Sequence, residues 1–251
     1  MMKRNNFPFS AVLGLNHAKT AILIVLVNPR AGGLLISGPR GIGKSTLMRS
    51  TQELIERPWR DIPVSVTEDR LFGTIDTEKA IYSGQKKLYP GIINEADQGV
   101  LYLDDANLLR EDLLDFILNI AEVGAYQLER DGLSLRCDTS FTVIAAINPE
   151  SGMLSGACLD QFGLFVNVDN IHDENTRVEI LKRTISFEKD CASFCKLWKL
   201  ENEKIKKAIH SAMSLLPKVV VSSAMIQLAS VYALKAHVSG PVSYTHLTLT
   251  T

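Results

Sequence analysis

The feature that most constrains this chain is a glycine-rich segment of eight residues, Gly38-Pro39-Arg40-Gly41-Ile42-Gly43-Lys44-Ser45. It matches the P-loop pattern G-x-x-x-x-G-K-(S/T) in full. An apolar run at Leu34–Ile36 precedes the segment, and a helical pattern that reaches about Glu56 follows it. This order predicts a buried strand, a tight loop and the N-terminus of a helix, which is the setting in which such a loop binds phosphate.

Each residue type in the loop has a chemical reason. Glycines let the backbone curl so that successive N–H groups point at phosphate oxygens. We predict that Lys44 reaches the β- and γ-phosphates, and that Ser45 places its hydroxyl on Mg²⁺. The loop and the residue after it, Thr46, are therefore the predicted nucleotide-binding residues. The alternative, a chance glycine-rich turn, accounts less well for the flanking strand and helix.

Polar residues also follow two other apolar runs. Gly99–Leu103 ends at Asp104 and Asp105, and Phe141–Ile147 ends at Asn148. At such a strand end in P-loop NTPases an Asp helps to hold Mg²⁺, and a neighbouring polar group orients the attacking water. We predict Asp104 as a metal ligand with Ser45, and we predict catalytic roles for Lys44, Asp104, Asp105 and Asn148. The alternatives are a helix cap for the carboxylates and an Asn-Pro turn for Asn148.

The wider pattern predicts an α/β fold, a three-layer αβα sandwich built on a parallel sheet with right-handed crossovers. Further elements are a strand at Pro63–Val66, a helix at Glu111–Val123, and a hairpin over residues 125–136 around Asp131-Gly132. Later in the chain, helical patterns cover Glu203–Leu215 and Ser223–His237.

The same pattern divides the chain into three parts. Residues 1–185 are predicted to form the nucleotide-binding core, and residues 186–238 a partial helical lid. The threonine-rich residues 239–251 follow a break at Ser239-Gly240-Pro241. We expect this last stretch to be a foreign or disordered tail, and it is left out of the fold prediction.

Composition excludes some function classes. The formal net charge is −1, and a global electrostatic case for nucleic acid is absent. No apolar run approaches the roughly 20 residues that a transmembrane helix needs. A cytoplasmic protein without a membrane partner is expected. The four cysteines contain no CxxC pair, so ordinary reduced thiols are predicted rather than a metal site.

In its order of motifs the chain resembles the small ATPase subunit of magnesium chelatase, within the AAA+ superfamily. The resemblance covers roughly residues 7–237 and is weaker at 185–215. It is carried by Phe7–Gly14, the P-loop, Asp69–Asp76, Pro90-Gly91, Gly99–Leu109, Glu129–Leu135, Asn148–Glu150 and Thr176–Ile180. The Asp69-Arg70-Leu71-Phe72-Gly73 and Glu129-Arg130-Asp131-Gly132 segments are specific to this family rather than general to P-loop proteins.

The resemblance implies a ring-forming ATPase that uses ATP and Mg²⁺, with ATP between neighbouring subunits. It implies a homo- or hetero-oligomeric ring, a companion ATPase-like subunit, and a larger porphyrin-binding subunit into whose substrate a metal is inserted. Residues 68–98 and 122–140 would project from the ring, and Gly14 would lie near the adenine. The residues do not distinguish magnesium and protoporphyrin from cobalt and a corrinoid.

Two positions depart from the family pattern. Asp105 stands where the family has Glu, and its carboxylate is one methylene shorter. Gln161 stands in Asp160-Gln161-Phe162-Gly163, where the family has an Arg that reaches a neighbour's γ-phosphate. A lid arginine that touches the nucleotide cannot be assigned. We expect nucleotide binding to survive these changes better than hydrolysis does.

Three functions remain open from the sequence. The first is an active ATPase motor of a chelatase-like complex. The second is a regulatory subunit that binds ATP but hydrolyses it poorly, which Asp105 and Gln161 favour. The third is a MoxR-like remodelling ATPase or a DNA-acting relative, against which the near-neutral charge and the chelatase-like segments argue.

Overall fold

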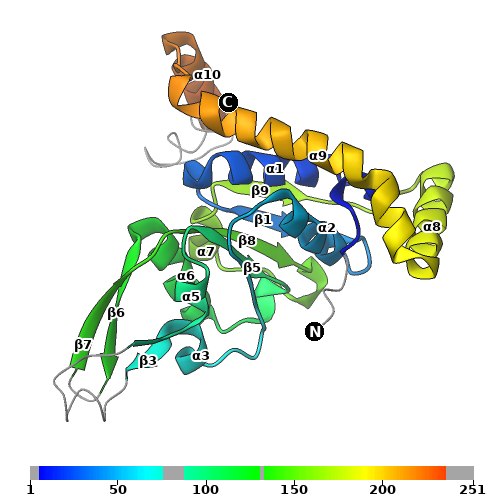
Figure 1. Cartoon of the computed structure of the whole chain (residues 1–251). Coiled ribbons are helices and arrows are strands. Elements are labelled where there is room, and N and C mark those ends of the chain that lie inside the picture. Colours follow the sequence, from blue (N-terminus) through cyan, green and yellow to red (C-terminus); the bar gives the residue numbers. More distant parts are fainter. Residues whose placement is uncertain (1–5, 76–87, 131–132, 236–251) are drawn as a thin grey trace.

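The computed structural model describes residues 6–75, 88–130 and 133–235 (Figure 1). Its centre is a five-stranded sheet in the order β2-β5-β8-β1-β9, in which every neighbouring pair is parallel. The strands are β1 Leu34–Ser37, β2 Trp59–Ile62, β5 Gly99–Leu103, β8 Phe141–Ile147 and β9 Leu164–Asn167. The predicted α/β class and parallel sheet are confirmed.

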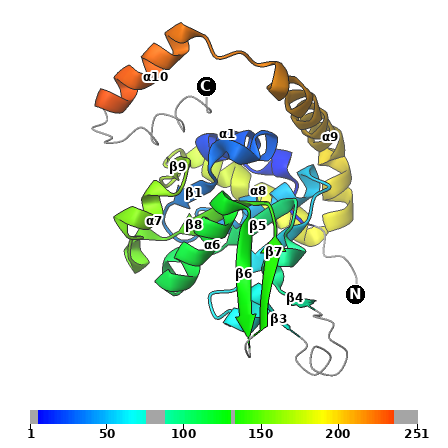
Figure 2. The ribbon, with the colours of Figure 1, turned by 90° about the vertical axis from the view of Figure 1, so that its left-hand side faces the viewer.

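Helices cover both faces of this sheet, as a three-layer arrangement requires. Because side chains alternate along a strand, Leu34 and Ile36 pack on one face and Leu35 packs on the other. The first face is covered by α1 (Asn16–Val27) and α2 (Lys44–Thr51), and the second by α6 (Glu111–Val123). Figures 1 and 2 show α1 and α6 on opposite sides of the strands.

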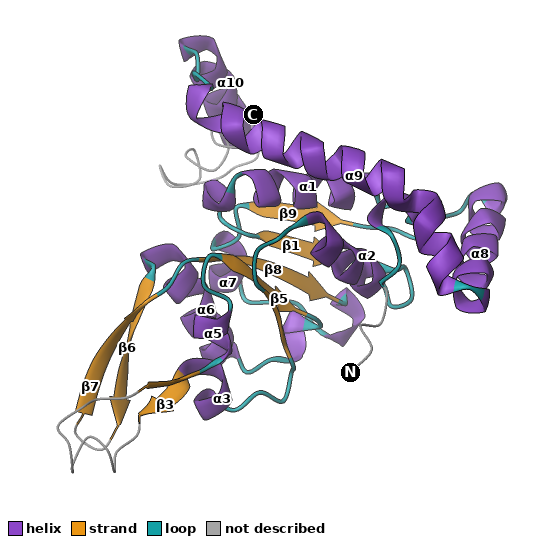
Figure 3. Ribbon diagram, viewed as in Figure 1, coloured by secondary structure: helices purple, strands orange, loops and turns teal. Residues whose placement is uncertain are grey.

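Shorter elements connect these layers. They are the 3₁₀ turn η1 (Phe9–Ala11), α3 (Glu68–Phe72), β3 (Gly73–Ile75), β4 (Leu88–Pro90), α5 (Ile92–Glu95) and α7 (Gly156–Asp160). The strands β6 (Ala125–Arg130) and β7 (Leu133–Asp138) form an antiparallel pair. Figure 3 shows this pair and β3 extending together away from the body. The hairpin prediction is confirmed in its pairing, while its turn, Asp131-Gly132, lies outside the described residues.

Two strand assignments need correction. The predicted strand at Pro63–Val66 is wrong, since β2 ends at Ile62 and a turn follows. Pro63 has no N–H to donate to a ladder, which explains why the strand stops before it. The strand β9 was not predicted at all. It has only four residues, and an apolar run as short as Leu164–Val166 does not by itself identify a strand.

The C-terminal part is helical, as predicted. It comprises α8 (Glu174–Lys189), α9 (Cys191–Leu215) and α10 (Ser223–Lys235). In Figure 1, α9 crosses over α1 on the outer face of the body. The boundary drawn at 185/186 stays a prediction and falls within α8, while residues 236–251, including the suspected tail, lie outside the described part.

Within the described residues no single helix is both long and apolar enough to cross a bilayer. Cys191–Lys218 and Ser223–Val231 meet that length and composition only when they are taken together, across a bend of 105°.

The start of the P-loop packs tightly on the last strand. A Cβ added to Gly38 would lie 2.4 Å from Val168 Cγ2 and 2.6 Å from the Val168 carbonyl oxygen. We expect Gly38→Ala to cost about 1–3 kcal/mol of folding free energy through overpacking. In a chain of this size that corresponds to a fall of roughly 3–10 °C in Tm.

The control is Gly156→Ala, because a Cβ there meets nothing within 4 Å. Thermal unfolding followed by circular dichroism should separate the two variants. Equal melting temperatures for Gly38→Ala and wild type would contradict the tight packing.

Candidate functional site

The loop between β1 and α2 has the backbone shape that phosphate binding needs. Gly41 and Gly43 adopt left-handed conformations, with φ of 79° and 97°, which residues with a Cβ rarely take. The Gly38 N–H donates to the Ile147 carbonyl at 3.2 Å and so ties the loop to β8. The first N–H groups of α2 have no partner within the helix and point out of its N-terminus. A triphosphate fits this cradle.

Lys44 is the first residue of α2, and its side chain is buried against the loop. Its Nζ donates to the carbonyl oxygens of Gly38 and, at 2.9 Å, of Pro39. Burial lowers the pKa of Lys44 below its ordinary value, while the nearby carboxylates of Asp105 and Asp104 oppose that shift. The ammonium therefore lies between the loop and two acids, where a β- or γ-phosphate would satisfy it.

The two predicted metal ligands meet. Ser45 Oγ donates to Asp104 Oδ1 at 3.2 Å, although 59 residues separate them in the chain. The phenol of Tyr102 donates to the same Oδ1 at 2.8 Å. Burial first, and then the charge of Asp104, raises the pKa of Tyr102 well above its ordinary value, so that the phenol stays a donor. The hydroxyl and carboxylate oxygens are the hard ligands that Mg²⁺ takes in nucleotide sites.

The remaining predicted catalytic residues lie around this centre. Asp105 has a left-handed backbone, with φ 51° and ψ 49°, at the sharp turn that ends β5. Asn148 is buried at the end of β8, but its amide serves the turn that follows. Its Oδ1 accepts from the Glu150 N–H at 3.2 Å, and its Nδ2 donates to Ser151 Oγ at 3.3 Å. This geometry matches the Asn-Pro turn alternative, and a catalytic role for Asn148 stays a prediction.

A pocket of about 890 Å³ adjoins the phosphate loop. One side carries Gly41–Gly43 and Thr46, and the other carries residues of α8. Val12, Leu13 and Leu15 line a third side, and Gly14 between them adopts a left-handed backbone with φ 68°. The apolar part of this lining suits a planar base, and an adenine beside the Gly14 segment stays a prediction.

Gln161 lies at the other edge of the sheet. It directly follows α7 and precedes β9, whose first residue, Leu164, pairs with Leu34 at the start of β1. The phosphate loop follows the other end of β1, so the length of β9, roughly 10 Å or more, separates Gln161 from its own loop. A side chain at position 161 is therefore distant from the phosphate loop of its own chain.

Comparison with known proteins identifies the family. The profile described as "AAA domain (dynein-related subfamily)" matches residues 33–161. The magnesium-chelatase 38 kDa subunit of Chlorobaculum tepidum is 34% identical over 88% of this chain and 67% of its own length. That of Rhodobacter capsulatus is 35% identical over 85% of this chain and 70% of its own length. This chain belongs to the magnesium-chelatase 38 kDa subunit family of AAA proteins.

Other comparisons agree. The "Magnesium-chelatase subunit ChlI homolog" of Methanocaldococcus jannaschii is 33% identical over 92% of this chain and 73% of its own. A chain from the complex between subunits BchI and BchD of magnesium chelatase superposes with a TM-score of 0.63 at 31% identity. That match covers 97% of this chain and 93% of the other. The resemblance read from the motifs is confirmed, as is the AAA+ fold.

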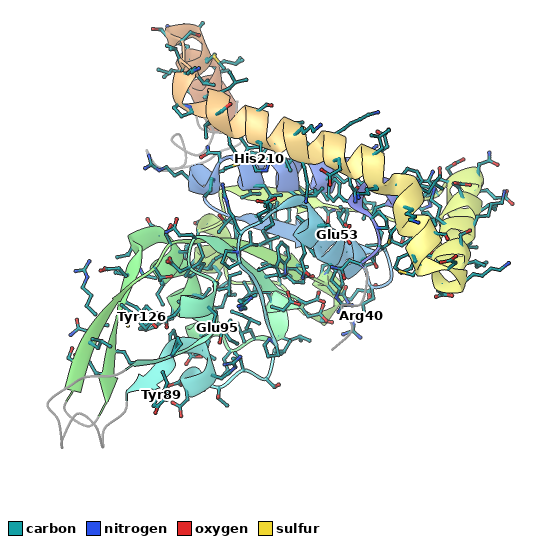
Figure 4. All side chains as sticks on the ribbon, viewed as in Figure 1. Arg40, Glu53, Tyr89, Glu95, Tyr126 and His210 are labelled. Atoms are coloured by element: carbon teal, nitrogen blue, oxygen red, sulfur yellow. The ribbon has the colours of Figure 1, made fainter. Side chains whose placement is uncertain are left out.

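For this chelatase-family chain, the structure brings together most of the predicted site. One centre is surrounded by residues of the loop and of the end of β5, namely Gly38, Gly41, Gly43, Lys44, Ser45, Asp104 and Asp105. Ile42 and Thr46 line the adjoining pocket. Arg40 is exposed at the outer end of the loop, as Figure 4 shows. Pro39 contributes its carbonyl to Lys44. The roles of these residues with bound nucleotide stay predictions.

Sequence reasoning missed several residues that build the site. Tyr102 positions Asp104, and Glu150 lies close enough for its charge to act on Lys44. Asn107 donates to the carbonyls of Asn148 at 3.0 Å and Gly152 at 2.9 Å, joining the ends of β5 and β8. A tyrosine in a buried strand reads as core, so only the alternation that aims residues 102 and 104 to the same face gave a signal.

The Tyr102 contact gives a testable prediction. Tyr102→Phe keeps the ring but removes the hydrogen bond to Asp104, which is worth about 1 kcal/mol. We expect the Mg²⁺ concentration at half-saturation of nucleotide binding to rise about fivefold, which is the factor that about 1 kcal/mol corresponds to. The measurement is a Mg²⁺ titration at fixed ATP.

Tyr126→Phe is the matched control. Tyr126 is also buried, and its phenol bonds Phe72 O and Asn94 Oδ1, both at 2.7 Å, far from the loop. It should leave the Mg²⁺ titration unchanged. An unshifted curve for Tyr102→Phe would show that Tyr102 does not position the metal ligand.

Proposed function

We propose that this chain is an ATP-binding AAA+ subunit that hydrolyses ATP to drive a chelatase-type complex, which inserts a divalent metal into a porphyrin. The observation that carries the proposal is the hydrogen bond of 3.2 Å between Ser45 and Asp104, with Lys44 buried beside it. It joins the phosphate loop to the acidic strand end, as a site for ATP and Mg²⁺ requires. The named relatives support magnesium as the inserted metal.

The chain's own residues divide the work. The loop N–H groups and Lys44 would hold the phosphates, and Ser45 and Asp104 would hold Mg²⁺. When bound, Mg²⁺ neutralises charge on the phosphate oxygens. Asp105 follows Asp104 at the sharp turn, where its carboxylate would orient and accept a proton from the attacking water. The pocket between residues 11–15 and α8 would hold the base.

We also propose the partners. This chain superposes on a chain from a complex of two chelatase subunits, which supports an oligomeric ring with a companion ATPase-like subunit. The position of Gln161 at the far edge of the sheet supports a site shared between neighbours. A porphyrin-binding subunit would be the target on which the ring acts.

A second candidate function is favoured by two residues. Asp105 is shorter than the family's Glu, and a misplacement of about 1 Å can cost about 10²-fold in rate. Gln161 has no charge to offer a γ-phosphate. A regulatory subunit that binds ATP and hydrolyses it poorly would carry such changes.

The experiment is a reconstitution. Purified chain is mixed with ATP, Mg²⁺, protoporphyrin and the other two subunits of the Rhodobacter capsulatus chelatase, in place of the 38 kDa subunit. Formation of metalloporphyrin, followed by fluorescence, supports the motor. ATP binding and assembly without turnover support the regulatory subunit. Binding of ATP with no association to either subunit contradicts both and favours a remodelling ATPase.

A further inference from the structure

One wall of the pocket is carried by a short turn near the N-terminus. The turn η1 (Phe9–Ala11) leads into residues 12–15, and Ala11 and Val12 line the pocket together with Gly41–Gly43. Three helices hold this wall in place. They are α1, which follows the wall directly in the chain, and α8 and α9, which are distant in the sequence.

Arg183 of α8 makes the central contact. Its Nη1 donates to the Ala11 carbonyl at 2.9 Å, and its Nε donates to Glu179 at 2.8 Å. The flat face of the same guanidinium lies over the Trp198 ring of α9, 4.6 Å from the ring centroid. The side chain is 19% exposed and also lines the pocket. One cation therefore joins the pocket wall, α8 and α9.

The helix α9 also contacts the same turn through two hydrogen bonds of Ser10. Ser10 N–H donates to the buried Asn202 Oδ1 at 2.9 Å, and Ser10 Oγ donates to the Trp198 carbonyl at 3.5 Å. Trp198 Nε1 is buried and has no hydrogen-bond partner among the described residues. On the other side, Lys19 of α1 donates to the Val12 carbonyl. Two cations thus hold consecutive carbonyls of the wall.

We propose that Arg183 is a positioning residue that couples occupancy of the nucleotide pocket to α9 through Trp198. The inference rests on the proposed nucleotide function and adds its regulation. A nucleotide bound between the wall and α8 would contact the elements that Arg183 joins, and would therefore change its hydrogen bond to Ala11 and its contact with Trp198 together. Coupling of this kind is reciprocal. If nucleotide binding changes how firmly α9 is attached, then a change in the attachment of α9 alters nucleotide affinity by the same factor.

The chemistry of arginine suits this position. A guanidinium donates in its plane to a carbonyl and a carboxylate, and it stacks its face on an aromatic ring at the same time. A lysine ammonium has no flat face and offers a single point charge. Lysine at position 183 should therefore retain the bond to Ala11 and lose the contact to Trp198.

The chain contains two tryptophans, which makes the test direct. In a Trp59→Phe background, Trp198 is the only fluorophore of its kind. ATP and ADP are titrated in the presence of Mg²⁺, and Trp198 emission is followed. Binding is measured separately with a labelled nucleotide, and phosphate release is measured at saturating ATP.

In the Trp59→Phe chain without a further substitution, we expect saturable nucleotide binding with a matching change in Trp198 emission. Arg183→Ala should raise the nucleotide Kd about 5- to 30-fold, as the loss of charged hydrogen bonds predicts, and abolish the emission change. Phosphate release at saturation should stay within about twofold, because the loop is untouched. Arg183→Lys should recover most of the affinity but little of the emission change.

Two further variants keep the test decisive. Arg136→Ala, at an exposed arginine on β7 that pairs with Asp138, should change nothing. Asn202→Ala removes the hydrogen bond from the Ser10 N–H to α9 while leaving Arg183, and it should weaken binding and reduce the emission change even if Arg183→Ala fails to fold.

The outcomes separate this inference from the function on which it rests. Unaltered affinity and emission in Arg183→Lys and Asn202→Ala would overturn the coupling while nucleotide binding stands. A fall in phosphate release at saturation with unchanged Kd would also overturn it. Absence of nucleotide binding in the unmodified chain would overturn both.

Discussion

Lys44→Ala is expected to weaken ATP binding by about 10- to 150-fold, because a hydrogen-bonded cation on phosphate is worth about 1.5–3 kcal/mol. Lys44 lies buried between the loop carbonyls and the two acids, so in the variant a water molecule is a poor substitute for its positive charge on the phosphates. That burial lowers the pKa of Lys44, so keeping its ammonium protonated costs free energy until an anion binds beside it. The nucleotide-free chain should therefore lose little stability.

Two measurements check this result. Calorimetric titration gives the Kd, and thermal unfolding with ATP and Mg²⁺ should raise the Tm of wild type but hardly that of the variant, because ligand stabilisation follows the ratio of concentration to Kd. Lys204→Ala is the control, since Lys204 is exposed and pairs only with Glu201 among the described residues. Equal affinities for Lys44→Ala and wild type would remove the basis of the phosphate-loop assignment.

Asp105→Glu combined with Gln161→Arg is expected to raise ATP turnover without tightening binding. A restored arginine finger is worth about 10³–10⁵ in turnover by analogy with GTPases. Correct placement of the water-orienting acid adds up to about 10². We expect a gain of at least about 10²-fold if the natural residues limit hydrolysis. Phosphate release at saturating ATP is the measurement.

The structure sharpens this test, since position 161 lies across the sheet from its own loop. In the proposed ring, an arginine there would act on a neighbour. Chains with Lys44→Ala and Gln161→Arg together provide the finger but bind ATP poorly. Mixed with Asp105→Glu chains, they should stimulate phosphate release, whereas neither chain alone should. A gain that is independent of mixing and of protein concentration would contradict a site shared between subunits.

Local patterns predicted a large part of the fold. The helix Glu111–Val123 and the strands Gly99–Leu103 and Phe141–Ile147 have the observed bounds. Their signals are periodic apolar side chains, which the chain carries whatever its neighbours are. β2 was misplaced and β9 missed, because short edge strands take their identity from the partner that they pair with.

The residues of the candidate site likewise fall into those that local sequence rules predict and those that they do not. The glycines that curl the phosphate loop act through their own backbone, and the acid at the end of β5 follows from the rule that parallel strands end at one edge. Asn107 and Arg183 could not be found by such rules. Each acts through a partner distant in the sequence, and neither their residue type nor their spacing marks them.

The sequence by itself therefore determined the glycine-rich loop, the acid at the end of β5 and the parallel sheet that carries them, because glycine conformation, strand periodicity and motif spacing are local properties. Only the tertiary structure decided that residues 11–15 and α8 line one pocket, that α9 contacts the turn beside it, and that Gln161 lies at the opposite end of the strands from its own phosphate loop. Those arrangements depend on how separate elements pack, and packing follows from surfaces that come together only in the folded chain.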